Sequence, residues 1–87
     1  MAFYASGAAD SAIARMGLQA THRDWREAFL AITGAVLGEA TGAQFAGMSW
    51  REREAWNWRL GGVPVVLIYD PARATIVTVL PTKRGKS

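Results

Sequence analysis

The chain has 87 residues, a length that accommodates one domain and leaves no room for a second. Hydrophobic residues make up 51% of it and charged residues 20%, which excludes an intrinsically disordered chain. It contains no cysteine and a single histidine. Disulfides, thiolate zinc sites and a cysteine nucleophile are therefore excluded, and we predict no metal site and no cofactor. The net charge of +3 favours an acidic partner.

The N-terminal residues show neither a basic segment nor a long apolar run, so no secretory signal is predicted. The longest strictly apolar run, residues 63–69, is much shorter than a membrane-spanning helix. We therefore expect a cytoplasmic chain. A single domain is predicted over residues 1–82, followed by a basic tail over residues 83–87.

An alanine-rich segment near the N-terminus predicts a first, short helix. Ser6 or Asp10 is expected to cap it, Arg15 to lie on its outer face, and Gly17 to end it.

A second helix is predicted to open at Thr21, which stands three residues before Asp24 as in a capping box. The residues that follow form an apolar stripe at helical spacing: Trp25, Phe29, Ile32 and Val36. The glycine-containing segment 38–48 shows little pattern, and we expect a loop there.

Three strands are predicted in the second half, over residues 54–60, 63–69 and 75–80. Gly61 and Gly62 are typical of a two-residue hairpin, and the segment 70–73 of a type I turn. The predicted architecture is an α+β domain. Two N-terminal helices pack on a three-stranded, or four-stranded, antiparallel β meander.

Residues 49–62 hold three of the four tryptophans together with three arginines. Such a mixture suits a groove for single-stranded nucleic acid, but it also suits an amphipathic element with a large core face. As a helix, the segment would spread its tryptophans around all sides. As a strand from residue 54, it places Trp56, Trp58 and Leu60 on one face. The other face receives Arg53, Ala55, Asn57 and Arg59.

The strand interpretation makes Trp56 and Trp58 core residues and the arginines an outward contact face. Residues 49–53 are expected to form one helical turn leading into the strand. The predicted binding surface consists of Trp50, Arg51, Arg53, Asn57 and Arg59.

Both faces of the last two strands are apolar. Simple alternation places Ile76, Thr78 and Leu80 on one side and Thr75, Val77 and Val79 on the other. The helices can cover only one face of the sheet. We therefore expect association through the second face, with a protein partner or with a second copy of the chain.

Two short strings, SAIAR at 11–15 and TIVTV at 75–79, resemble small ribonuclease-toxin domains of the barnase/RelE-like kind. Relatives of these domains occur in toxin–antitoxin, polymorphic-toxin and phage loci. The resemblance implies the helix–helix–meander fold. Its usual activity would be metal-independent cleavage of RNA. The family's histidine falls on Ser11, which cannot act as a base near neutral pH.

If the chain is an enzyme, the resemblance points to Arg15, His22 and Thr78 as the catalytic candidates. If it binds RNA, the phosphate-binding candidates are Arg15, Arg59, Lys83 and Arg84.

The missing histidine, the small size and the surplus apolar sheet face favour a non-catalytic function. We expect a small protein-binding inhibitor or antitoxin-like protein, such as a phage anti-defence protein, built on a ribonuclease-toxin-like scaffold. The alternative is an RNA-binding or RNA-cleaving toxin domain. A third hypothesis is that the chain is a structural subunit that dimerises through its sheet.

Overall fold

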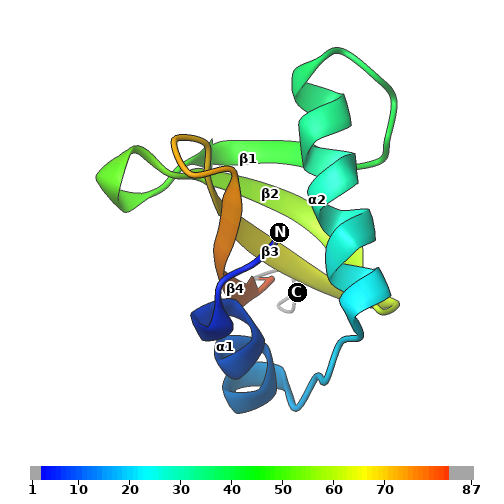
Figure 1. The fold of residues 1–87 in the computed structure, drawn as a ribbon, viewed down its shortest axis with the longest axis vertical. Helices are drawn as coiled ribbons and strands as arrows, with labels where there is room; N and C mark the ends of the chain where they lie inside the picture. Colours follow the sequence, from blue (N-terminus) through cyan, green and yellow to red (C-terminus); the bar gives the residue numbers. More distant parts are fainter. Residues whose placement is uncertain (1–2, 83–87) are drawn as a thin grey trace.

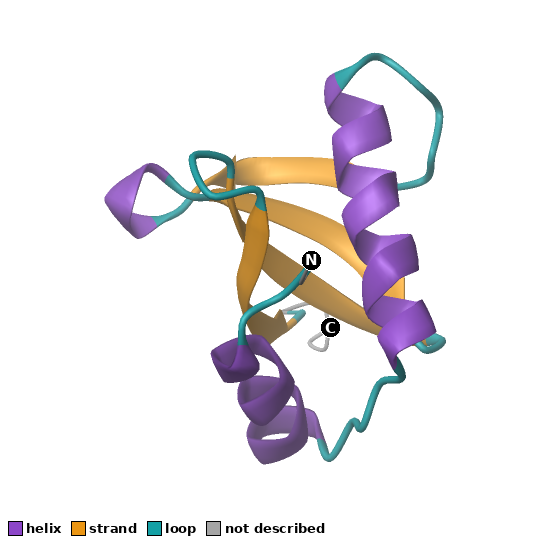
Figure 2. Cartoon of the chain, viewed as in Figure 1, coloured by secondary structure: helices purple, strands orange, loops and turns teal. Residues whose placement is uncertain are grey.

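The computed structural model describes residues 3–82. Figure 1 shows two helices followed by a four-stranded antiparallel sheet in which neighbours in sequence are neighbours in space. Both helices lie on the same face of the sheet (Figure 2), which confirms the α+β architecture. In these residues no helix is long and apolar enough to cross a membrane. The elements are α1 (Ser6–Met16), α2 (His22–Val36), β1 (Gln44–Met48), the 3-10 helix η1 (Trp50–Glu52), β2 (Glu54–Leu60), β3 (Val63–Asp70) and β4 (Thr75–Pro81).

The two helices differ in how they begin. The residue at the N-cap of α1 is Ala5, which offers no side-chain cap, so the predicted caps Ser6 and Asp10 are wrong. Ser6 is instead the first helical residue, and Asp10 lies within the helix. At the other end, Gly17 adopts a left-handed conformation (φ 62°) and ends the helix as predicted.

The predicted capping box of α2 is confirmed. The amide of Asp24 donates to Thr21 Oγ1 at 3.1 Å, and the amide of Thr21 donates to Asp24 Oδ2 at 2.9 Å. These reciprocal bonds satisfy two amides that the helix itself leaves unpaired.

Strand β1 lies in the segment that was predicted to be a loop, so that prediction is wrong for residues 44–48. Gln44 pairs with Asn57 and Phe45 with Trp56, and the register shifts before Met48. Most of the strand is exposed. Strand β1 is an edge strand that is held by pairing with β2 and buries neither of its faces. Its sequence therefore lacks the alternation of apolar and polar residues by which a strand is predicted.

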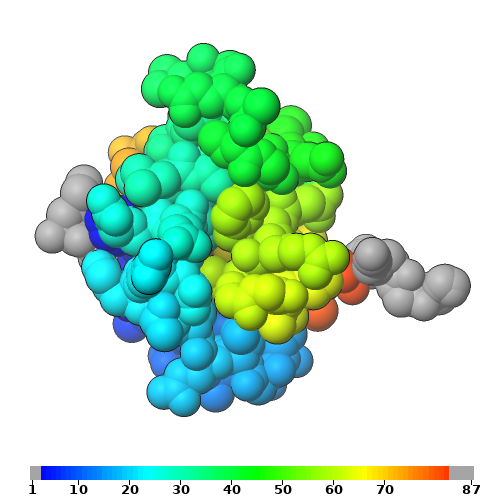
Figure 3. All heavy atoms as spheres, turned by 90° about the vertical axis from the view of Figure 1, so that its right-hand side faces the viewer, coloured from blue at the N-terminus to red at the C-terminus, as the bar shows by residue number. Residues whose placement is uncertain are grey.

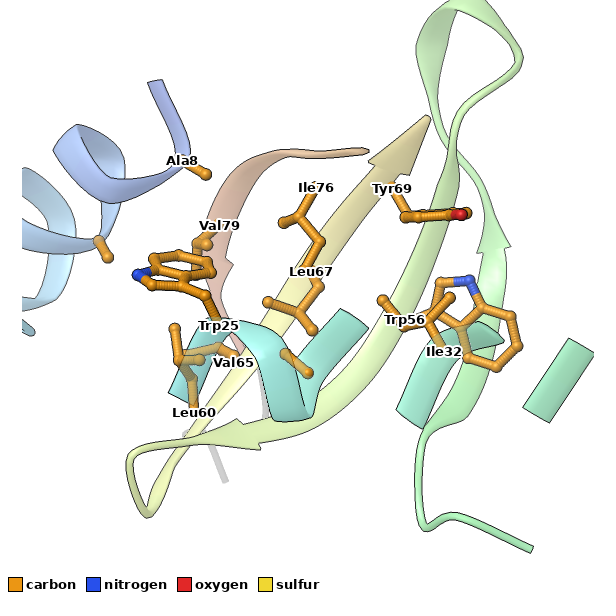
Figure 4. Close-up of a cluster of buried hydrophobic side chains, with 12 residues drawn as sticks. Ala8, Trp25, Ile32, Trp56, Leu60, Val65, Leu67, Tyr69, Ile76 and Val79 are labelled. Atoms are coloured by element: carbon orange, nitrogen blue, oxygen red, sulfur yellow. The ribbon is translucent and has the colours of Figure 1, made fainter. Parts of the chain in front are cut away.

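The core lies between the helices and the sheet (Figure 4). Trp56 and Leu60 are buried and Trp58 is half-buried, which confirms the face predicted for the β2 tryptophans. Trp25 of α2 is 1% exposed and stacks on the ring of Tyr4, with 4.6 Å between ring centroids. The core is thus built on large rings contributed by both layers.

The alternation predicted for β4 is wrong, because the strand contains a register shift. Ile68 pairs with Thr78, whereas Tyr69 pairs with Ile76, so β4 has one residue more than β3 between these pairs. The extra residue returns the chain to the core face, and Ile76 and Val79 are both buried.

Ser11 of α1 binds the backbone next to this register shift. Its hydroxyl accepts hydrogen bonds from Val79 N at 3.0 Å and from Thr78 Oγ1 at 3.1 Å. It donates to the carbonyl of Ala8 at 3.0 Å. The hydroxyl therefore uses its donor and both of its acceptor positions in holding α1 against β4.

The connection between β1 and β2 is a one-turn 3-10 helix over Trp50–Glu52, in agreement with the predicted helical turn, but its backbone is left-handed. Arg51 (φ 60°) and Glu52 (φ 59°) both have positive φ. The amide of Arg53 donates to the carbonyl of Trp50 at 3.3 Å. This is the geometry of a type I′ hairpin turn, in which asparagine and glycine usually occupy the two central positions.

We expect the double substitution Arg51→Asn, Glu52→Gly to raise the free energy of unfolding by about 1–2 kcal/mol, because left-handed backbone is costly for other L-residues. Urea denaturation followed by circular dichroism measures the change. The matched control is Ala72→Asn, Arg73→Gly in the β3–β4 turn, where neither residue has positive φ, and no gain is expected there. An equal gain in both turns would contradict the strain argument.

Candidate functional site

A groove of about 900 Å³ lies on the sheet face that points away from the helices. Its apolar lining includes residues from all four strands: Ala46, Ala55, Val66 and Leu80. Polar atoms come from Gln44, Asn57 and Arg59. The groove is therefore an apolar surface with a polar group along one side.

Strand register explains the floor of the groove. Val66 pairs with Asn57 on one side and with Leu80 on the other. Paired residues of an antiparallel sheet project from the same face, so the three side chains form a row across three strands. Val66 and Leu80 are half-buried and Asn57 is exposed.

The sheet face that points away from the helices is uncovered only in part. Ile68 also points away from the helices, since it alternates with the core residues Leu67 and Tyr69, yet it is 1% exposed. The open part of the face is thus restricted to the groove.

Among residues 3–82, Arg59 is the only charged residue that lines the groove. Its guanidinium Nη1 lies 3.4 Å from the carbonyl of Gly62, a long hydrogen bond to the adjacent hairpin. Within residues 3–82 no carboxylate pairs with it. The groove therefore presents a positive charge beside an apolar floor.

Arg53 was predicted to belong to an outward contact surface, but it is held in an ion pair. Its Nε lies 3.7 Å from Asp70 Oδ2, and the two side chains are only 18% and 14% exposed. Asp70 also accepts a hydrogen bond from Ala72 N at 3.0 Å and lies 3.9 Å from Arg73. Arg53 is therefore engaged at one end of the sheet, where its buried Nε makes no hydrogen bond, and it is not available as a free cation.

The five residues of the predicted binding surface do not form one site. Asn57 and Arg59 line the groove, whereas Arg53 belongs to the ion pair with Asp70. Trp50 and Arg51 lie on the exposed β1–β2 turn and do not line the groove.

The three residues named as catalytic candidates do not form one site either. Thr78 donates its hydroxyl to Ser11, as described above. Arg15 is exposed on α1, and exposed His22 packs beside the ring of Phe3, with centroids 5.6 Å apart. No hydrogen bond or ion pair between described residues joins Arg15, His22 and Thr78 to one another.

The phenol of Tyr69 has a perturbed pKa. Burial raises the pKa of the Tyr69 phenol, and the nearby carboxylates of Glu54 and Asp70 raise it further. Because the neutral phenol is favoured, Tyr69 is a poor candidate for a general base. Across the described part of the chain, no three histidine, aspartate or glutamate side chains gather as metal ligands. Lys83 and Arg84, named as phosphate-binding candidates, lie outside the described residues.

Sequence reasoning missed part of the groove. Ala46 was not expected in it, because strand β1 was not predicted. The apolar character of Val66 and Leu80 was visible in the sequence, but the pairing that aligns them with Asn57 was not. Comparisons with protein families, with characterised proteins and with solved structures give no match to this chain.

Proposed function

We propose that the chain is a non-catalytic protein-binding module of the inhibitor or antitoxin-like type. The observation that carries this proposal is the groove on the open sheet face. Its floor of small and aliphatic side chains suits the apolar side chains of a protein partner. Arg59, which pairs with no carboxylate among residues 3–82, places a positive charge beside that floor and favours a partner with a carboxylate at the matching position.

The role of Ser11 also supports a non-catalytic function. At the position where the resemblance expects a histidine, the chain has a hydroxyl whose hydrogen-bonding capacity is used by Ala8, Thr78 and Val79. The position thus serves to dock α1 on β4.

A photo-crosslinking residue at position 57 tests the proposal in cells that carry the gene in its native surroundings. We expect a covalent adduct with one protein, because the Asn57 side chain is exposed in the groove. A crosslinker at position 13 is the matched control, since Ile13 is 51% exposed on the helix layer.

Adding Leu80→Glu to the position-57 crosslinker should abolish the adduct, because it places a charge in the floor of the groove. Equal adducts from positions 57 and 13, or an adduct that survives Leu80→Glu, would contradict docking in the groove.

Binding of RNA is the second candidate, and exposed Arg59 and Asn57 are the observation in its favour. Stacking of bases has little support, since Trp56 is buried and Trp58 is half-buried. A nucleic-acid adduct at position 57, or growth arrest on expression of the chain alone, would favour this alternative.

A further inference from the structure

The two edge strands of the sheet, β4 and β1, differ in whether their outer backbone groups are paired. At the β4 edge, Ala5 N donates to Ile76 O at 2.9 Å and Ile76 N donates to Phe3 O at 3.1 Å, so the N-terminal segment covers that edge. Within residues 3–82, no strand pairs with the outer edge of β1. The β1 sequence QFAGM contains neither a charge nor a proline, two of the means by which proteins keep a free edge from pairing.

Exposed apolar side chains accompany this free edge. Phe45 is 54% exposed and Met48 62% exposed. They pair with Trp56 and Glu54, which share one face of β2, so the register shift in β1 directs both side chains to the helix side of the sheet. Phe45 contacts Trp56 edge-on, with 5.4 Å between ring centroids. In the described part of the chain, no helix covers Phe45 and Met48 as α2 covers the neighbouring core.

The C-terminal end of α2 extends past β1, the outermost strand (Figure 1). Ile32 is fully buried, but Val36, one turn later, is 61% exposed, and Leu37 is 77% exposed. In Figure 3 the segment that follows α2 forms the top of the molecule. The apolar stripe of α2 therefore continues beyond the sheet, with no strand beneath it.

We propose that two copies of the chain associate by antiparallel pairing of their β1 strands, forming one eight-stranded sheet with all helices on one face. The end of α2 lies at the Gln44 end of β1, because Thr41 Oγ1 donates to Ala31 O at 2.6 Å just before the strand begins. A two-fold axis perpendicular to the sheet, midway between the two paired β1 strands, places the α2 end of the second copy over the opposite end of the strand. That opposite end carries the exposed Met48.

The partner of β1 is inferred to be a second copy of the chain rather than a strand of another protein, because the two uncovered features complement each other. Each chain supplies both an uncovered strand and an uncovered helix end, located so that the two-fold rotation brings one over the other. Since β1 has no charged residue, antiparallel self-pairing opposes no like charges.

The dimer is independent of the proposed function, because the groove lies on the other face of the sheet. It has a consequence for that function, however. Ala46 lines the groove and lies in the middle of β1, so the dimer places two grooves next to each other on one continuous face. A partner with two matching segments would then gain from binding both.

Sedimentation velocity of the full chain tests the proposal. We expect a species of twice the 9.4 kDa chain mass at about 100 μM, a concentration that populates dimers of micromolar dissociation constant. Val36→Lys and Phe45→Lys should each raise the dissociation constant at least about 100-fold, because each dimer buries the new charge twice.

The matched control is Leu30→Lys, since Leu30 is 47% exposed on the same helix but off its core-facing stripe, and this variant should remain dimeric. Circular dichroism of dilute samples checks that every variant is folded. A wild-type monomer at this concentration, or a Val36→Lys variant that stays dimeric, overturns the proposal. Loss of the dimer in the groove variant Leu80→Glu, with Val36→Lys still dimeric, would assign the interface to the sheet face instead.

Discussion

Trp25→Ala should lower the free energy of unfolding by about 3–5 kcal/mol, the range for replacing a buried aromatic residue with alanine. Trp25 is 1% exposed and stacks on Tyr4, so its removal leaves a cavity between α2 and the N-terminal segment. A domain of this length has about 4–13 kcal/mol of total stability. The variant is therefore expected to lose a large share of its stability and to unfold at a much lower urea concentration, as followed by circular dichroism.

The chain offers a matched control for this loss. Trp50 is the same residue type but is 54% exposed, so Trp50→Ala should change stability by no more than about 0.5 kcal/mol. Similar losses for Trp25→Ala and Trp50→Ala would show that the core does not lie between α2 and the sheet.

Ser11→Ala should cost about 1–3 kcal/mol, because it leaves the amide of Val79 without an acceptor in a partly buried position. The loss arises at one hydroxyl group and creates almost no cavity. Thr78→Val should cost less, since it removes one donor to Ser11 and leaves the bond from Val79 intact.

Ser6→Ala serves as the control for Ser11→Ala, because Ser6 is exposed at the start of the same helix and its side chain makes no capping bond. Thermal unfolding of the three variants should rank Ser11→Ala as the least stable. If Ser11→Ala and Ser6→Ala melt together, the hydroxyl does not hold α1 against β4.

Local patterns were sufficient to predict α2 and the three strands that follow the loop. The capping box at Thr21 and Asp24, the stripe from Trp25, and the alternation of Trp56, Trp58 and Leu60 each depend on near neighbours in sequence. Strand β1 could not be predicted in this way, because pairing with β2 creates it and its own residues bury no face. The register shift in β4 could not be predicted for a related reason. The backbone next to the shift bonds to Ser11, which lies 68 residues before Val79.

The candidate site was predicted in part. Alternation along β2 placed Asn57 and Arg59 on the outward face, and both line the groove. The same alternation gave Arg53 the same role, but its proximity to Asp70 depends on how β2 and β3 pair. Charge and spacing along one strand indicate which face a side chain occupies. They do not indicate which cation finds a partner on the neighbouring strand.

The contact between α1 and β4 is expected to form late in the synthesis of the domain, because its two sides lie far apart in the sequence. Strands β2, β3 and β4 pair with their immediate neighbours, so they can form a sheet as soon as they are made. We expect helix α1 to dock late although it is made before the strands, because Ser11 must wait for Val79, 68 residues later. Closing so long a loop is slow relative to forming hairpins. Until it closes, Ala8 and Ala12, both fully buried in the folded domain, remain exposed to solvent on the nascent chain.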